Sequence, residues 1–282
     1  MDNKLIIGVN TAMFDGWDLD TAFSVIKKSG FKFVELAYNQ GYVGNLNAAL
    51  FEDQHARHVK ELLEKHQLGM HALGCTVPLS GEDAIAQFSA RIRFAGKLGV
   101  KYLNISPGKQ EFHDVIVSNL KQLAAVAREH NCIICLENGG DPNYNFMTCA
   151  EEVFAALDEI AQDSVGLNVD PGNTLSMRSD IDPIADALTM LPRATHFHVK
   201  DVQKRHGEYR FPAIGQGDLD YRQILVQLAE RQIPCSLEIP LRMHRKADTF
   251  PVRSEDKVSL DLITEVLADS RKYIESVVGY SL

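Results

Sequence analysis

A long apolar run is missing from this sequence. No stretch of the 282 residues approaches the roughly eighteen consecutive apolar residues that mark a membrane-spanning helix. The first residues, MDNKLIIGVN, enter an apolar run directly, without the long apolar core and small-residue cleavage site of a signal peptide. We therefore expect a cytoplasmic protein with no membrane partner.

An excess of positive charge is missing as well. The chain carries 29 Lys and Arg against 38 Asp and Glu, which gives a net charge of −9. Binding along a phosphate backbone needs a basic surface, so nucleic acid is disfavoured as a partner. The overall charge leaves a local basic patch open.

Cysteine is scarce and odd in number. The five cysteines lie mostly in apolar runs, and we interpret them as reduced core thiols, as in a cytoplasmic protein. Cys132 and Cys135 form a C-x-x-C motif, but the segment CIICLE is typical of a strand, in which positions i and i+3 face opposite sides. A redox or zinc role for this pair is therefore disfavoured.

Eight short apolar runs recur along the chain, each suited to one strand. They begin at Leu5, Phe31, Leu68, Val100, Cys132, Val165, Thr195 and Cys235, and helical patterns lie between them at 19–30, 84–99, 115–131 and 221–232, with a last one at 259–277. Without any linker or composition shift, these units predict an α/β protein with the (β/α)8 TIM-barrel fold, in a single domain over residues 1–282. The alternative is a doubly wound open sheet, but no G-x-G-x-x-G motif follows the first run.

Polar residues stand at the ends of the predicted strands, where TIM barrels carry their active sites. In the segment ATHFHVKD, residues 194–201, apolar and polar residues alternate, so one face of a strand would carry two histidines and a lysine. The polar positions on the inward faces are Asn10, Glu35, His71, Asn104, Ser106, Glu137, Asp170, His196, His198, Lys200 and Glu238. We expect the polar face of each strand to look into the mouth of the barrel.

Four of these residues have the chemistry of a metal site. Glu137, Asp170, His198 and Glu238 come from four consecutive strands at matching depth. Three carboxylates and one imidazole suit one divalent ion such as Mn²⁺, Mg²⁺, Co²⁺ or Zn²⁺. Without an ion the carboxylates would repel one another, and one or more would take a proton. The alternative is four unrelated polar residues at solvated strand ends, which their equivalent positions disfavour.

Seven short motifs spread over nearly the whole chain resemble those of the xylose-isomerase-like TIM barrels, also called the sugar phosphate isomerase/epimerase or AP endonuclease family 2 superfamily. The motifs are GVNT, FVEL, LEN, NVDPGN, HFHVKD, IGQGDLDY and LEI. The resemblance implies metal ligands at Glu137, Asp170, His198 and Glu238. The chain has Asn173 where many members have a histidine after the strand-six aspartate. The AP endonucleases of this superfamily need a histidine there to bind three zinc ions, so Asn173 and the net charge disfavour a nuclease.

The resemblance also implies an activity. By analogy with the ketose 3-epimerases, Glu137 and Glu238 would be metal ligands and at the same time the acid and base that move a proton through an enediolate. We therefore expect a divalent-metal-dependent isomerase or epimerase of a small sugar or polyol, phosphorylated or not. The alternatives are a keto-polyol dehydratase similar to inosose dehydratase and a sugar-binding barrel without catalysis. A homo-oligomer is compatible with the sequence.

Four residues are predicted to contact substrate, namely Asn10, Glu35, His71 and Lys200. For three of them, a purely structural role is the alternative to substrate contact. His71 would be a core histidine, Glu35 would form a salt bridge to a neighbouring strand, and Lys200 would pair with Asp201 or a barrel carboxylate.

Basic residues and glycines also occur near the last two predicted strands. Arg242, His244 and Arg245 follow the last strand, where TIM barrels often bind phosphate, but a solvated surface patch is the alternative. Gly215 and Gly217 are interpreted as a tight turn rather than a phosphate cradle.

Overall fold

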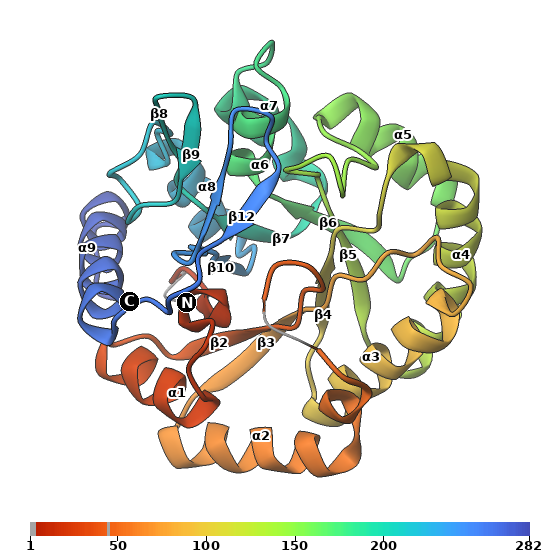
Figure 1. Ribbon diagram of the computed structural model, residues 1–282, viewed down its shortest axis with the longest axis horizontal. Helices are drawn as coiled ribbons and strands as arrows, with labels where there is room; N and C mark the ends of the chain where they lie inside the picture. The colour runs from red at the N-terminus through yellow and green to blue at the C-terminus, as the bar shows by residue number, and fades with distance from the viewer. Residues whose placement is uncertain (1–3, 44–45) are drawn as a thin grey trace.

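The computed structural model describes residues 4–43 and 46–282. Eight parallel strands close into a barrel in the order β1-β10-β7-β6-β5-β4-β3-β2, which confirms the predicted (β/α)8 fold (Figure 1). The barrel strands are β1 (Ile7–Asn10), β2 (Phe33–Ala37), β3 (Gly69–Gly74), β4 (Tyr102–Ile105), β5 (Ile133–Glu137), β6 (Val165–Val169), β7 (Ala194–Val199) and β10 (Cys235–Leu237). Each of the eight predicted apolar runs supplies one of them.

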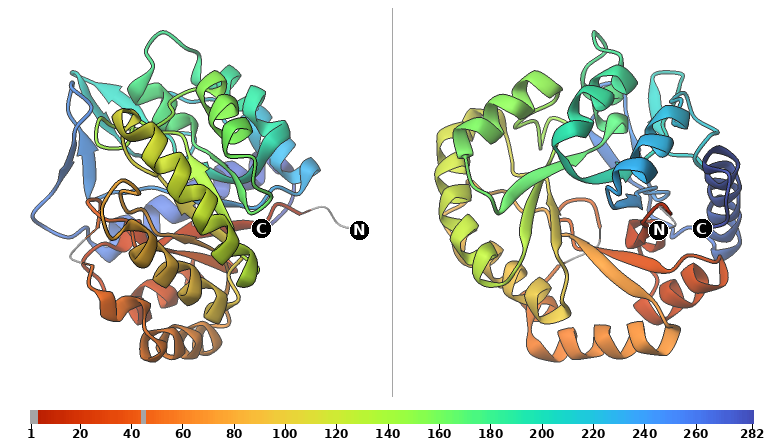
Figure 2. Two further views of the ribbon diagram at one scale, coloured as in Figure 1. Left: turned by 90° about the vertical axis from the view of Figure 1, so that its right-hand side faces the viewer. Right: turned by 180° about the vertical axis from the view of Figure 1, so that it is seen from behind.

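Helices surround the barrel and cover the apolar outer faces of its strands (Figures 1 and 2). They are α1 (Leu19–Lys28), α2 (Asp53–His66), α3 (Ala84–Leu98), α4 (His113–Glu129), α5 (Ala150–Ile160), α6 (Pro171–Met177), α7 (Pro183–Met190), α8 (Arg222–Arg231) and α9 (Leu260–Val278), with short 3-10 turns η1 (Thr11–Phe14), η2 (Ala48–Phe51), η3 (Gln110–Phe112) and η4 (Leu191–Arg193). Helix α1 shows which local features of the sequence form these helices. Asp18 accepts the N–H of Thr21 as its N-cap, and the stripe of Ala22, Phe23 and Ile26 is buried.

The barrel register brings the predicted site residues to one level. Strand β10 closes the barrel between β1 and β7, with Ser236 opposite His198. On the neighbouring pair, Glu137 lies opposite Asn168. Glu238 lies two residues after Ser236, and Asp170 lies two residues after Asn168, at the carboxyl ends of their strands. Since alternate residues of a strand face the same side, Glu238 and Asp170 face the same way as Ser236 and Asn168. The ends of four consecutive strands in the chain therefore meet at one opening.

A second sheet lies beyond the carboxyl ends of the barrel strands and was not predicted. Its strands β8 (Gln203–Arg205), β9 (Glu208–Arg210), β11 (Met243–Arg245) and β12 (Pro251–Arg253) pair in the order β12-β11-β9-β8, and all pairs are antiparallel. Figures 1 and 2 show that these strands come from the loops after β7 and β10. This accessory sheet forms a wall above part of the barrel opening.

The five cysteines are all buried and free. Burial raises the pKa of the Cys132 thiol to about 11, and it raises the pKa of Cys135 further, so neither thiol is ionised near neutral pH. The interpretation of these residues as core thiols is confirmed. Across residues 4–43 and 46–282, no helix has both the length and the hydropathy to cross a bilayer.

Candidate metal centre

The structure gathers the four predicted metal ligands. One donor atom from each of Glu137, Asp170, His198 and Glu238 lies within 4.8 Å of the others. The Asp170 side chain is fully buried and that of His198 is 1% exposed, whereas the carboxylates of Glu137 and Glu238 keep 10% and 12% exposure. The two glutamates are therefore the members of the set that a solute in the barrel mouth can reach.

The His198 ring is held so that one nitrogen faces the other ligands. Its Nδ1 lies 2.6 Å from Glu137 Oε1, and its Nε2 lies 3.1 Å from Glu35 Oε1. Glu35 is fully buried and also accepts a hydrogen bond from Asn104 at 3.1 Å. A carboxylate on the far ring nitrogen fixes the tautomer and orientation of a metal-binding histidine. This geometry leaves Nδ1 as the ring nitrogen that faces the other candidate ligands, and Glu35 as the residue that orients the ring.

The charges of His198 and its neighbours are coupled in the metal-free protein. Burial alone would lower the pKa of His198, but the carboxylates of Glu238, Glu35 and Glu137 raise it well above its ordinary value. Burial would raise the pKa of Glu35, yet His198 lowers it to about 2. The surrounding carboxylates therefore favour the protonated form of His198, and a divalent ion bound at Nδ1 would compete with that proton.

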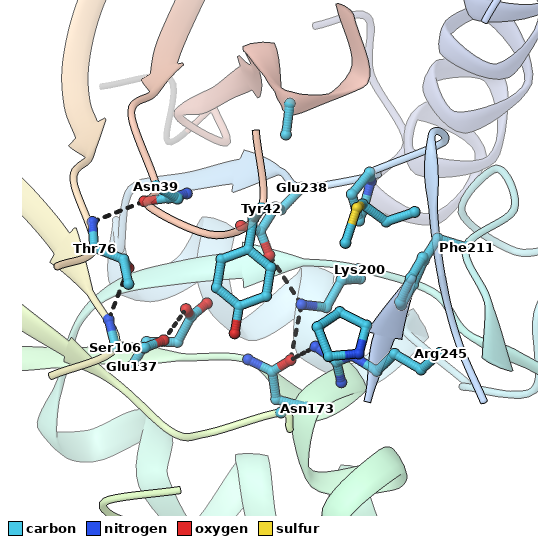
Figure 3. A pocket seen from close by; sticks show the side chains of 15 residues that line it. Asn39, Tyr42, Thr76, Ser106, Glu137, Asn173, Lys200, Phe211, Glu238 and Arg245 are labelled. Carbon is cyan, nitrogen blue, oxygen red and sulfur yellow. Dashed lines mark hydrogen bonds and ion pairs between the residues drawn. The ribbon is translucent and has the colours of Figure 1, made fainter. Parts of the chain in front are cut away.

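Lys200 brings a buried positive charge to the same carboxylates. Its Nζ lies 2.6 Å from Asp170 Oδ2 and 2.9 Å from Glu238 Oε2, and it donates to Asn173 Oδ1 at 2.9 Å (Figure 3). Burial alone would lower the pKa of Lys200, but the carboxylates of Asp170 and Glu238 raise it above its ordinary value. The ion pair is with barrel carboxylates rather than with Asp201.

The donor set fits a divalent cation. Asp170 Oδ1 accepts the N–H of Asn173, while its buried Oδ2 has no partner in hydrogen-bond geometry, although Lys200 Nζ is near. Burial raises the pKa of Asp170 above its ordinary value in spite of Lys200. Three carboxylates converge here with one imidazole nitrogen, and oxygen-rich sets of this kind bind hard or borderline ions such as Mn²⁺, Mg²⁺, Co²⁺ or Zn²⁺.

Of the four residues predicted to contact substrate, only Lys200 lines the pocket. Asn10 Oδ1 accepts the N–H of Ala12, which caps the turn after β1. Glu35 lies behind His198 and forms an ion pair with it across the barrel, not with a neighbouring strand as the structural alternative expected. His71 packs between the rings of Phe33 and His196, with centroid distances of 5.4 and 5.5 Å. The structure therefore places Asn10, Glu35 and His71 behind the pocket wall, and gives Glu35 an orienting role instead of substrate contact.

The glycines after β7 bind a carboxylate of the protein itself. The N–H groups of Gly215 and Gly217 donate to Asp201 Oδ2 at 2.9 and 2.8 Å, and Leu219 N–H donates to Oδ1 at 3.2 Å. A Cβ atom on Gly217 would overlap the Asp201 carboxylate. These glycines form a turn anchored next to Lys200, as predicted, and not a phosphate cradle.

A pocket of about 600 Å³, including its open mouth, lies above the two glutamates (Figure 3). Barrel ends and the loops that follow them supply the polar lining, and the accessory sheet and its neighbouring loops supply much of the apolar wall. The lining residues that the sequence did not single out as substrate contacts are Ala12, Asn39, Tyr42, Thr76, Ser106, Gly140, Asn173, Phe211, Pro240, Met243, Arg245 and Pro251. Of these residues, the sequence had indicated only Ser106, Asn173 and Arg245, because they lie at or just after the ends of predicted strands.

Comparisons with known proteins agree with this geometry. The profile of a family described as xylose isomerase-like TIM barrel matches residues 23–255. No curated protein matches significantly.

Solved structures share the fold at low sequence identity. D-psicose 3-epimerase with D-tagatose, from Clostridium cellulolyticum H10, superposes with a TM-score of 0.74 at 14% identity, over 97% of this chain and 99% of the other. A xylose isomerase-like TIM barrel protein from Mycobacterium smegmatis, in complex with magnesium, gives 0.70 at 18% identity, over 98% and 97%. The probable 3-DHS dehydratase of petrobactin synthesis from Bacillus anthracis gives 0.68 at 14% identity, over 94% and 97%. Likeness at this identity shows the fold alone.

Proposed function

The chain belongs to the xylose isomerase-like TIM barrel family, and from this premise we propose that it is a divalent-metal-dependent isomerase or epimerase of a small sugar or polyol. The observation that carries the proposal is the pair of glutamates, Glu137 and Glu238, which belong to the metal-ligand set and also line the pocket. The superposed epimerase acts on a ketose, as its name says, and the magnesium complex supports a divalent ion.

We propose that the two glutamates flank the reacting carbon of a bound substrate. Glu137 ends β5 and Glu238 follows β10, and in the barrel order β6 and β7 lie between these strands. Ser106 Oγ donates to Glu137 Oε2 at 3.1 Å, and Lys200 Nζ donates to Glu238 Oε2 at 2.9 Å. Each carboxylate is thereby fixed by a donor. We propose that one removes the proton next to the substrate carbonyl and the other returns a proton from the opposite side.

A divalent ion held by Glu137, Asp170, His198 and Glu238 would supply Lewis-acid polarisation of the substrate oxygens. The protein contributes the rest. Burial raises the pKa of Glu238, but Lys200 and His198 outweigh burial and lower it, so its side chain is held in the carboxylate form that a metal ion binds. The presence of all four expected ligand residues in one cluster argues against a sugar-binding barrel without catalysis.

A dehydratase of a keto-polyol is the second candidate. The same base next to a carbonyl could remove a proton and expel a neighbouring hydroxyl, and the superposed protein from Bacillus anthracis is a probable dehydratase. The nuclease alternative is not proposed, because Asn173 has no metal-binding imidazole and instead accepts hydrogen bonds from Lys200 and Arg245.

Solvent deuterium exchange tests the proposal directly. Purified protein loaded with Mn²⁺ would be incubated in D₂O with ketoses, aldoses and keto-inositols, one compound at a time. The phosphate esters and the carboxylic acid derivatives of these compounds would be tested in the same way. We expect deuterium at a single carbon next to the carbonyl of at least one compound, since removal and return of a proton exchange it with solvent. Mass spectrometry and NMR would locate the label. A complete screen without incorporation, with metal present at one ion per chain, would reject enolisation chemistry. Loss of a hydroxyl would identify the dehydratase.

A further inference from the structure

Arg245 is a buried cation that faces the pocket and has no carboxylate partner. It ends β11, where it pairs with Tyr209 of β9 and Pro251 of β12, and it is 6% exposed. Its Nη2 donates to Asn173 Oδ1 at 3.0 Å, and its Nη1 donates to Ser176 Oγ. Both acceptors are neutral. In residues 4–43 and 46–282, no Asp or Glu oxygen forms an ion pair with this guanidinium.

Among the described residues, the nearby carboxylates bond to groups other than Arg245. The buried Asp141 carboxylate accepts hydrogen bonds from the Tyr42 hydroxyl and the Asn143 N–H. The preceding arginine, Arg242, is different, because it pairs with Asp15 and does not line the pocket. A buried charge without an opposite charge is costly unless a ligand supplies one.

Arg245 and Lys200 converge at one point of the pocket. Both donate to the same Asn173 Oδ1, at 3.0 and 2.9 Å, and both lie beside the Phe211 ring, 5.6 and 5.9 Å from its centroid. Figure 3 shows the two side chains on the same side of the cavity as Asn173. A Cβ atom at Gly140 would overlap both Asn173 Oδ1 and Arg245 Nη2, so the backbone there leaves just enough room for the guanidinium.

From this arrangement we infer that the substrate carries an oxyanion, a carboxylate or a phosphate, which Arg245 binds with help from Lys200 on the Asn173 side of the reacting carbon. A guanidinium presents paired N–H donors that match carboxylate and phosphate oxygens, and such charge-assisted hydrogen bonds are stronger than neutral ones. A neutral sugar offers hydroxyls alone and would leave Arg245 with neutral hydrogen-bond partners only. The inference deepens the proposed function, because it names the substrate class of the same pocket.

Binding of matched neutral and anionic compounds tests this inference without any turnover. The pairs are xylitol with xylonate and D-fructose with D-fructose 6-phosphate, titrated by calorimetry into the Mn²⁺-loaded protein. We expect at least one anion to bind about tenfold or more tightly than its neutral partner, because one hydrogen bond to a charged group is worth about that factor. The pair that shows the preference distinguishes a carboxylate from a phosphate.

Three variants make the test specific. Arg245→Gln should abolish the preference, and Arg245→Lys should keep part of it, because the charge remains without the paired donors. Arg210→Gln is the matched control, since Arg210 lies on the same accessory sheet with 63% of its side chain exposed, and it should bind like the wild type. All of these variants keep the four candidate metal ligands. Any chelation of Mn²⁺ by xylonate therefore affects every protein equally.

Three results would overturn the inference. These are equal binding of neutral and anionic partners by the wild type, no binding of either anion at millimolar concentration, and a preference that persists in Arg245→Gln. A preference lost in Arg245→Gln but kept in Arg210→Gln supports the inference even if the deuterium screen is negative. Failure of the proposed function and failure of this inference are therefore distinguishable.

Discussion

Replacing Glu137 or Glu238 with Gln is expected to lower turnover by roughly 10²–10⁴, the usual contribution of a positioned acid or base. Glutamine keeps the size of the side chain and one oxygen donor, but it cannot accept the proton. Metal affinity should fall only in part, because three of the four ligands remain. Steady-state rates at increasing Mn²⁺, together with a metal titration of each variant, would separate the two effects.

Asp170→Asn and His198→Asn are the matched comparisons. Asp170 and His198 belong to the ligand set but are buried below the pocket, with side-chain exposures of 0% and 1%. Their variants should lose activity mainly through lost metal, and excess Mn²⁺ should restore much of it. If excess Mn²⁺ restored the two glutamine variants as fully, the glutamates would be ligands only. The base would then have to be sought elsewhere, and Lys200, which lines the pocket, would qualify only if metal binding to Asp170 and Glu238 freed it to lose its proton.

Lys200→Met is expected to destabilise the metal-free protein by about 3–5 kcal/mol, the usual cost of removing one partner from a buried ion pair. The Lys200 side chain is 3% exposed and neutralises Asp170 and Glu238, which would be left crowded together. A divalent ion on the same carboxylates replaces that charge, so the loss should be much smaller with Mn²⁺. Thermal unfolding with EDTA and with Mn²⁺ would measure the difference, and a drop of roughly 10 °C is expected with EDTA alone.

The Lys200 variant should also bind Mn²⁺ more tightly than the wild type. By linkage, a ligand that restores more stability to the variant must bind it with higher affinity. Lys204→Met is the control, because Lys204 lies in the accessory strand β8 and is exposed. Equal destabilisation with and without metal, or unchanged affinity for Mn²⁺, would show that Lys200 and the ion do not share the same carboxylates.

The barrel could be predicted because its signals are local and repeated. Each strand appears as one apolar run, and each helix as one amphipathic segment, so eight units in sequence define the fold. The accessory sheet has no such signal. Its strands have three residues each, and β9 and β11 are far apart in the chain. Their pairing depends on how the loops after β7 and β10 pack over the opening, which no single segment encodes. The single-domain organisation over residues 1–282 and a homo-oligomer stay predictions.

The candidate ligands could be predicted because the period of two identifies the inward face at a strand end. Depth inside the barrel is harder to predict. The register between β2 and β3 shifts, so that Val34 lies opposite Met70 but Glu35 lies opposite Ala72. His71 falls at this irregularity and points to the rings of Phe33 and His196 instead of the pocket. The sequence indicated Arg242, His244 and Arg245 together, and only the tertiary structure shows that Arg245 alone of the three lines the pocket, beside Asn173.

The most direct measurement is the anomalous diffraction of crystals grown with Mn²⁺. We predict one manganese peak per chain, surrounded by carboxylate oxygens of Glu137, Asp170 and Glu238 and by Nδ1 of His198, with Lys200 Nζ displaced from Asp170. Ligand distances of roughly 2.0–2.2 Å would identify direct coordination, as for other small divalent ions. The absence of a peak at saturating Mn²⁺, with Lys200 Nζ still joined to Asp170 and Glu238, would contradict a metal centre at these four residues.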